Sequence, residues 1–151
     1  MATSASKINL FLAFKLPAAY FTGVRLKTID KQQCTTTVKH RWINQNPFKS
    51  MFWAVQGMAA ELSTGALVMD EIQAQNKPIS MLVANNKANF SKKARGRITF
   101  TCKDGLAIRA AIQKAVDTGE GQTCWMHSVG TNAEGVVVSQ FDFEWTVKLK
   151  G

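Results

Sequence analysis

The stretch from Ser50 to Met69, SMFWAVQGMAAELSTGALVM, is nearly apolar and contains a single ionisable side chain, Glu61. This composition predicts a long, nearly apolar helix that must pack beneath other elements, with one carboxyl group along its length. An ionised carboxylate is rarely buried without a partner, because desolvation raises its pKa. A carboxyl group with a raised pKa suits a general base working near neutral pH, so Glu61 is the first candidate functional residue.

The helical period places Glu61 on a stripe of mostly small and polar residues: Ser50, Ala54, Gly57, Thr64, Gly65 and Val68. The opposite stripe is continuously hydrophobic and suits packing under a sheet: Val55, Ala59, Leu62, Ala66 and Met69. A glycine inside a helix costs about 1 kcal/mol relative to alanine. Gly57 and Gly65 therefore predict that a ligand or a second subunit approaches the helix closely. The alternative is a helix edge with Glu61 simply in solvent.

The composition is that of one globular domain spanning residues 1–151, with residues 1–22 as a helical extension. A net charge of +9 favours anionic partners. The three cysteines lack a C-x-x-C spacing, which fits a reducing, cytoplasmic setting. Two isolated histidines, His40 and His127, are too few for a metal cluster, so we predict no metal. We also predict no membrane span, because Gln56, Glu61, Ser63 and Thr64 interrupt residues 50–69 and the apolar run at 8–14 is short.

The remaining patterns predict an α+β order of elements. We expect a helix at 6–14, a hairpin of strands 24–30 and 34–42, the long helix after the turn at Asn44–Pro47, and a second hairpin of strands 79–90 and 97–103 across a basic turn at 91–96. A surface helix at 106–117 and two strands at 122–131 and 136–148 follow. In the last strand Phe141, Phe143, Trp145 and Val147 alternate with polar residues, which predicts one buried face. The expected fold is a curved antiparallel sheet wrapped around one long central helix, with an extra N-terminal helix and a surface helix.

This order resembles the hotdog fold of the thioesterase and thioester dehydratase superfamily. The segment Asn44 to Met51 (NQNPFKSM), continued by Met58 to Gly65 (MAAELSTG), resembles a bacterial family of uncharacterised thioesterase-like proteins, and the resemblance covers nearly the whole chain. In phenylacetyl-CoA-type thioesterases of the superfamily, a His-Gly-Gly turn opens the helix. The equivalent positions here are Phe52, Trp53 and Ala54, so only the carboxylate, Glu61, and the upstream asparagine, Asn46, carry over as side chains.

The resemblance implies a mechanism. The backbone N–H of Trp53, at the start of the helix, would polarise the thioester carbonyl. Glu61 would activate water or attack the carbonyl itself, and Asn46 would orient the water or the substrate. In this fold the site usually forms between two subunits, which implies a homodimer, with pairing into a tetramer left open. No cofactor is implied.

Substrate-binding candidates follow from the same resemblance: Phe48, Ser50, Phe52, Gly57, Thr64 and Gly65. The aromatic side chains among them would line an acyl tunnel, although core packing explains them equally well. The hydroxyl of Thr64 would touch substrate or bond to a helix carbonyl. In the basic segment SKKARGR, Lys93 and Arg95 are candidates for binding the phosphates of coenzyme A. The alternative there is a solvated turn that protects a sheet edge.

Three functions remain open at this level. The first is an acyl-CoA or acyl-carrier-protein thioesterase that uses Glu61. The second is a protein of the same fold that binds acyl thioesters or fatty acyl ligands without hydrolysing them. The third, nucleic-acid binding, rests on the charge alone, and the chain has no zinc-finger spacing, no RNP-like motif and no arginine-rich helix. We therefore expect no specific nucleic-acid partner.

Overall fold

The computed structural model describes residues 4–151; residues 1–3, where the predicted N-terminal extension begins, lie outside this range. Its helices are α1 (Ala5–Lys15), α2 (Pro17–Phe21), the 3-10 helix η1 (Trp42–Asn44), α3 (Trp53–Gln75) and α4 (Gly105–Thr118). Its strands are β1 (Arg25–Ile29), β2 (Cys34–Lys39), β3 (Ile79–Phe90), β4 (Arg97–Cys102), β5 (Gln122–Thr131) and β6 (Val137–Leu149).

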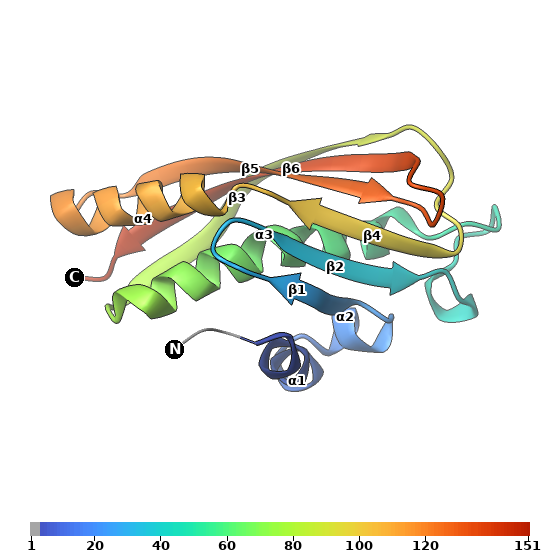
Figure 1. Cartoon of the computed structure of the whole chain (residues 1–151), viewed down its shortest axis with the longest axis horizontal. Coiled ribbons are helices and arrows are strands. Elements are labelled where there is room, and N and C mark those ends of the chain that lie inside the picture. Colours follow the sequence, from blue (N-terminus) through green and yellow to red (C-terminus); the bar gives the residue numbers. More distant parts are fainter. Residues whose placement is uncertain (1–3) are drawn as a thin grey trace.

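The six strands form one antiparallel sheet in the order β1-β2-β4-β5-β6-β3, and the sheet curves around α3 (Figure 1). The fold is therefore the expected α+β arrangement, a sheet wrapped around one long helix. Along β6, Phe141, Phe143, Trp145 and Val147 are buried against α3, so the predicted alternation is confirmed.

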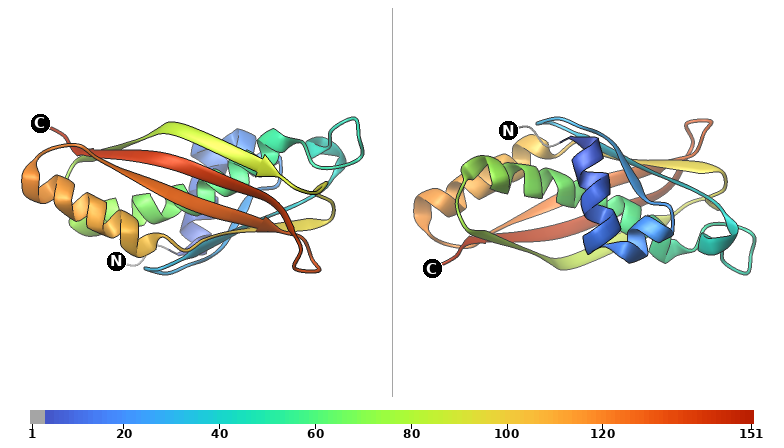
Figure 2. Two further views of the ribbon diagram at one scale, coloured as in Figure 1. Left: turned by 90° about the horizontal axis from the view of Figure 1, so that it is seen from above. Right: turned by 90° about the horizontal axis from the view of Figure 1, so that it is seen from below.

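Two helices lie outside this pair of layers. The helix α1 crosses α3 on the side that the sheet leaves uncovered (Figure 2). The side-chain amide of Asn9 attaches α1 to the edge strand β1, since it donates to the carbonyl of Leu26 (3.0 Å) and accepts from its N–H (2.8 Å). The amphipathic helix α4 buries Ile108 and Ile112 and packs against α3, β5 and β6.

The long helix differs from the expectation at both ends. The sequence indicated the stretch from Ser50 to Met69, whereas α3 begins at Trp53 and ends at Gln75. Pro47 therefore lies in the loop before the helix. The loop is held by bonds to the β3–β4 connection, with the N–H of Met51 donating to the carbonyl of Ala94 (2.8 Å). At the other end, Asn76 in the left-handed conformation terminates the helix, and Pro78 follows.

The second predicted hairpin is wrong. Strand β3 pairs with β6, whereas β4 pairs with β2 and β5, so the basic segment 91–96 crosses the end of the sheet instead of forming a tight turn. This leaves β3 at one edge of the sheet. The prediction failed because two β-patterned runs that follow each other in the sequence look like a hairpin even when, as here, two other strands separate them in the sheet. The strand predicted at 34–42 also ends early, since Trp42 belongs to η1, and α2 was not predicted.

None of the helices among residues 4–151 combines the length with the apolar content that crossing a bilayer requires.

Candidate functional site

Glu61 lies near the middle of α3 and is exposed. One turn before and one turn after it, Gly57 and Gly65 face the rings of Phe141 and Trp145. A Cβ atom at position 65 would stand 3.2 Å from the Trp145 ring, which explains the glycine there. The close approach that the sequence indicated is thus made by side chains of the chain's own sheet.

Glu61 is an exposed residue, yet desolvation by the surrounding protein raises the pKa of its carboxyl group. The other two carboxylates of α3 differ in this respect. Asp70 pairs with Lys31 (3.1 Å) and Glu71 with Arg109 (3.8 Å). Glu61 has no ion-pair partner in the part of the chain that the structure describes. It therefore combines a raised pKa with access from outside.

Thr64, a predicted substrate contact, is buried and fully engaged within the protein. Its hydroxyl donates to the carbonyl of Glu61 (2.8 Å) and accepts from the indole N–H of Trp145 (2.9 Å). The hydroxyl thus bonds back to a helix carbonyl, which was the alternative to a substrate contact. Thr64 fixes the turn that carries Glu61 against β6.

A cleft of about 530 Å³ lies at the N-terminus of α3 and gathers many of the predicted residues. Asn46, Phe48, Ser50, Phe52 and Trp53 line it from the loop and the first turn, and Lys92 and Lys93 line it from the β3–β4 connection. Two lining residues had no signal in the sequence: Phe90, at the end of β3, and Gln56, a buried side chain that accepts from the hydroxyl of Ser139 (2.8 Å).

The start of α3 has no side-chain cap. The carbonyl of Phe52 accepts from the N–H groups of Val55 (3.0 Å) and Gln56 (3.3 Å). Helix geometry leaves the N–H groups of Trp53 and Ala54 without an intrahelical acceptor. Together with the positive end of the helix dipole, they are suited to bind an anion or a polarised carbonyl oxygen in the cleft.

Asn46 organises the loop beside this cleft. Its side-chain oxygen accepts from the N–H of Phe48 (2.9 Å) and of Ser50 (3.2 Å). Its amide group donates to the hydroxyl of Ser50 (2.9 Å) and to the carbonyl of Met51 (3.3 Å). Both polar atoms of Asn46 are thus occupied by the loop, and Ser50 is buried as its partner.

The basic segment divides between the cleft and the scaffold. Lys93 lines the cleft, as does Lys92. Arg95 instead donates from Nε to the carbonyl of Lys49 (3.1 Å), and Arg97 donates to the hydroxyl of Thr37 (3.0 Å). Arg95 therefore joins the two loops that form the cleft and is not among the residues that line it.

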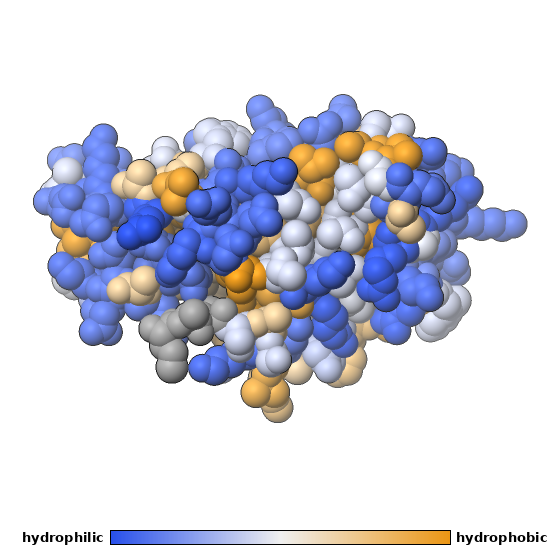
Figure 3. Space-filling view, in the orientation of Figure 1, coloured by the Kyte–Doolittle hydropathy of each residue, from blue (hydrophilic) through white to orange (hydrophobic). Residues whose placement is uncertain are grey.

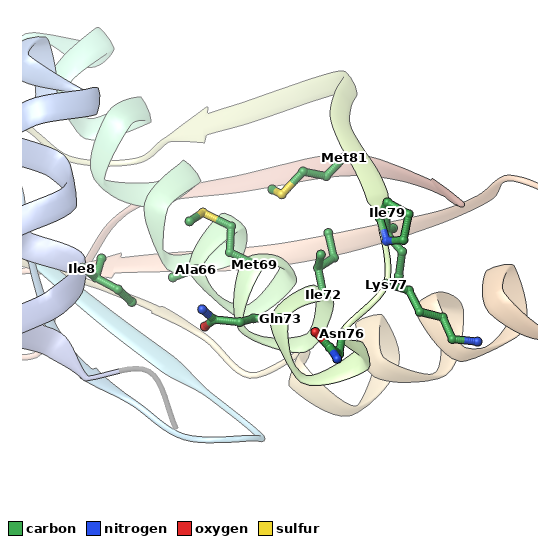
Figure 4. Close-up of a pocket in the computed structure, with 10 residues that line it drawn as sticks. Ile8, Ala66, Met69, Ile72, Gln73, Asn76, Lys77, Ile79 and Met81 are labelled. Carbon is green, nitrogen blue, oxygen red and sulfur yellow. The ribbon is translucent and has the colours of Figure 1, made fainter. Parts of the chain in front are cut away.

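A second, apolar groove of about 600 Å³ lies on the uncovered side of α3 (Figure 4). It is lined by Ile8 of α1, by Ala66, Met69, Ile72, Gln73 and Asn76 of α3, and by Lys77, Pro78, Ile79 and Met81 at the start of β3. Met69, expected on the stripe opposite Glu61, borders this groove and not the sheet. Ile72 follows Glu61 by eleven residues, about three helical turns, so this edge of the groove lies on the same side of α3 as Glu61. No sequence pattern indicated this groove, because α1 and β3 form two of its walls.

Glu61 is not among the residues that line the cleft. It lies eight residues after Trp53, about 12 Å along the helix axis at about 1.5 Å per residue. Its side chain leans toward the N-terminus of α3, as helical side chains do, which places the carboxyl group between the cleft and the apolar groove. Among residues 4–151, no three His, Cys, Asp or Glu side chains gather closely enough to hold a metal ion.

Comparisons with solved structures identify the fold. The chain superposes on a Pseudomonas aeruginosa protein of unknown function, described as a probable thioesterase, with a TM-score of 0.83 and 19% identity over 99% of each chain. It matches another P. aeruginosa thioesterase, solved as a mutant, with a TM-score of 0.75 and 13% identity over 99% of this chain and 97% of that one. A thioesterase from Haemophilus influenzae gives a TM-score of 0.72 and 10% identity over 99% of this chain and 93% of that one.

These TM-scores, over nearly the whole of each chain, establish a shared hotdog fold, as the sequence resemblance predicted. No curated protein matches the chain. One family model does, over residues 6–147, and its description is a domain of unknown function. The chain therefore belongs to the DUF4442 family, the family of that domain of unknown function.

Proposed function

We propose that this protein hydrolyses acyl thioesters, with Glu61 as the general base or nucleophile. The observation that carries the proposal is the position of Glu61, whose carboxyl group has a raised pKa and which lies along α3 between the cleft and the apolar groove. The hotdog fold that the chain shares with proteins described as thioesterases supports the same reaction class.

The two cavities suit the two halves of an acyl thioester. The apolar groove accommodates an acyl chain, because Ile8, Met69, Ile72 and Met81 offer it hydrophobic walls. The cleft at the start of α3 accommodates the carrier, because Lys92 and Lys93 supply cations for phosphate groups. A thioester that joins the two would hold its carbonyl group between the start of α3 and Glu61.

The chemistry then follows from the geometry. The N–H of Trp53 or Ala54 would stabilise the negative charge that develops on the carbonyl oxygen. Glu61 would take a proton from water as the water attacks the carbonyl carbon, or would attack it directly and be released from the anhydride by water. The C–S bond breaks, and the thiol leaves with a proton. Asn46 and Arg95 would act as positioning residues that hold the loops around the cleft.

We further propose a homodimer paired along β3, and pairing of dimers into a tetramer stays open. The strand β3 has twelve residues, lies at the edge of the sheet and is mostly exposed over its second half. A long exposed edge strand presents a row of unpaired N–H and C=O groups with which a strand of another chain can pair. A second chain on this edge would complete the side of the site that Met81 borders.

The test measures free thiol released from short, medium, long and aromatic acyl-CoAs by the purified protein and by Glu61→Gln. Glu134→Gln serves as the matched control, since Glu134 is an exposed carboxylate in the β5–β6 turn. Turnover that is lost in Glu61→Gln and retained in Glu134→Gln supports the proposal. Equal turnover in all three proteins would refute it.

The second candidate is a protein that binds acyl thioesters without hydrolysing them. The engagement of Asn46 within its own loop favours this candidate, since the site then lacks a second polar side chain beside Glu61. It predicts saturable binding of acyl-CoA by the wild type, with no thiol release from acyl-CoA or acyl-carrier-protein substrates.

A further inference from the structure

The helix α1 is apolar on both of its sides, although only one side is packed against the protein. Ile8 and Leu12 point inward and are buried. Leu10, Phe11 and Phe14 occupy the outward face, where Leu10 is 63% and Phe14 is 77% exposed. Hydrophobic side chains project at the lower edge of the molecule in Figure 3, where α1 lies in Figure 1.

The exposed face continues into the next elements. Leu16 is half exposed, and Phe21, at the end of α2, is 65% exposed. The amide of Asn44 donates to the carbonyl of Thr22 (2.9 Å), which holds η1 beside the end of α2. Trp42 of η1 is 82% exposed. A cluster of large exposed hydrophobic residues of this kind marks an interaction surface.

The charges around this surface are of one sign. Lys7 shares the outward arc of α1 with Leu10 and Phe14, and Lys15 ends the helix. The chain contains no aspartate or glutamate before Asp30. A second copy of the chain placed face to face here would bring lysines together without a carboxylate to pair them. An anionic surface, in contrast, complements both the hydrophobic and the cationic parts.

We propose that the outward face of α1, extended by Phe21, docks on the surface of a bilayer that contains anionic phospholipid. The exposed rings would enter the boundary between headgroups and acyl chains, and Lys7 and Lys15 would contact lipid phosphates. This is attachment to a membrane surface, which requires no spanning helix. Docking on a membrane surface is separate from the thioester reaction and does not depend on it.

The first test is sedimentation of the full chain with two kinds of vesicle, phosphatidylcholine alone and phosphatidylcholine with about 30 mol% phosphatidylglycerol. The phosphatidylglycerol gives the second kind a strongly anionic surface. We expect binding to the mixed vesicles, weakened at least fivefold at high salt. The double variant Phe14→Ser with Phe21→Ser is expected to lose at least tenfold in affinity. Leu106→Ser, on α4, is the matched control for removal of an exposed hydrophobic residue and is expected to bind like the wild type.

The second test reverses the charges. Lys7→Glu with Lys15→Glu should abolish the preference for anionic vesicles, whereas Lys114→Glu, on the exposed side of α4, should weaken it far less. Failure of the wild type to bind anionic vesicles would overturn the proposal, as would equal losses in the α1 and α4 variants. A change of oligomeric state in Phe14→Ser with Phe21→Ser, with vesicle binding unchanged, would instead assign the face to a protein partner.

Discussion

The indole N–H of Trp145 on β6 donates a 2.9 Å hydrogen bond to the hydroxyl of Thr64 on α3, one turn after Glu61. The same hydroxyl donates to the carbonyl of Glu61 (2.8 Å). A side chain of the sheet is thereby connected through one buried hydroxyl to the backbone of the candidate catalytic residue. This connection sets the rotation of α3 against β6.

Thr64→Val removes the hydroxyl and leaves the buried indole N–H of Trp145 without an acceptor. Such a loss costs about 1–3 kcal/mol, so we expect a decrease of this size in the free energy of unfolding, measured with urea. Thr64→Ser keeps the hydroxyl and is expected to lose less. A larger loss in Thr64→Ser than in Thr64→Val would show that the methyl group, and not the hydrogen bond, carries the stabilisation.

The raised pKa of Glu61 predicts opposite effects on activity and on stability. When folding raises the pKa of a group, protonation of that group stabilises the folded state. This stabilisation is complete at pH values below the pKa of the unfolded chain, about 4.3 for glutamate. It is lost as the pH rises through the higher pKa of the folded state. Glutamine does not ionise. Glu61→Gln is therefore expected to be more stable than the wild type near pH 7, with the difference vanishing below about pH 4.

Hydrolysis by the wild type should follow the reverse trend, because the base must be deprotonated. We expect kcat/KM to fall as the pH decreases through the raised pKa of Glu61. Unfolding midpoints and rates measured across the same pH series give both curves. A constant stability difference between wild type and Glu61→Gln from pH 4 to pH 8 would contradict a burial-raised pKa.

The sequence predicted those parts of the fold that depend on local periodicity. The run from Ser50 to Met69 became α3, and the alternation in β6 placed Phe141 and Trp145 on the buried face. It missed features set by long-range pairing. Strand β3 pairs with β6 and not with β4, the next strand in the sequence. Contacts between residues far apart in the sequence decide how strands pair, and local patterns do not record them.

The same distinction applies to the candidate site. The loop residues from Asn46 to Trp53 line one cleft, which their closeness in the sequence favoured. The groove beside Met69 requires α1 and β3 to converge on α3, and no local pattern records that convergence. Likewise, Gly57 and Gly65 signalled a close approach, but the residue pattern does not reveal that aromatic rings of β6 make it.

Asn46 is expected to act on the loop more than on the reaction itself. Asn46→Ala removes the acceptor for the N–H groups of Phe48 and Ser50, so we expect a loss of about 1–3 kcal/mol in stability and a raised KM. Gln32→Ala, at an exposed amide side chain in the turn between β1 and β2, is the control. If Asn46→Ala lowers kcat with stability and KM unchanged, Asn46 orients the water directly.

The apolar groove predicts a dependence on acyl-chain length. Met69→Trp adds bulk to the groove wall and should exclude part of a long acyl chain. Excluding about two methylene groups, each worth about 0.8 kcal/mol, lowers kcat/KM for long acyl-CoAs roughly tenfold. Short acyl-CoAs should be little affected. Ala74→Trp, on an exposed part of α3 outside the groove, controls for the added indole, and equal losses for short and long chains would place the acyl chain elsewhere.

The three cysteines are expected to differ in their reactivity. Cys34 and Cys102 lie opposite each other on β2 and β4 and are buried, and desolvation raises the pKa of both thiols, that of Cys102 to about 12. Cys124 is partly exposed, and burial raises its pKa less far. Because the thiolate is the reactive form, a disulfide reagent near pH 8 should label one thiol in the native protein and all three after unfolding.

Cys124→Ser should then remove the native signal and leave two thiols that react only through opening of the sheet. The rate at which these two react reports the free energy of separating β2 and β4 when closing is fast relative to labelling. Rapid labelling of Cys34 or Cys102 in the native protein would mean that the outer strands open far more readily than their buried side chains indicate.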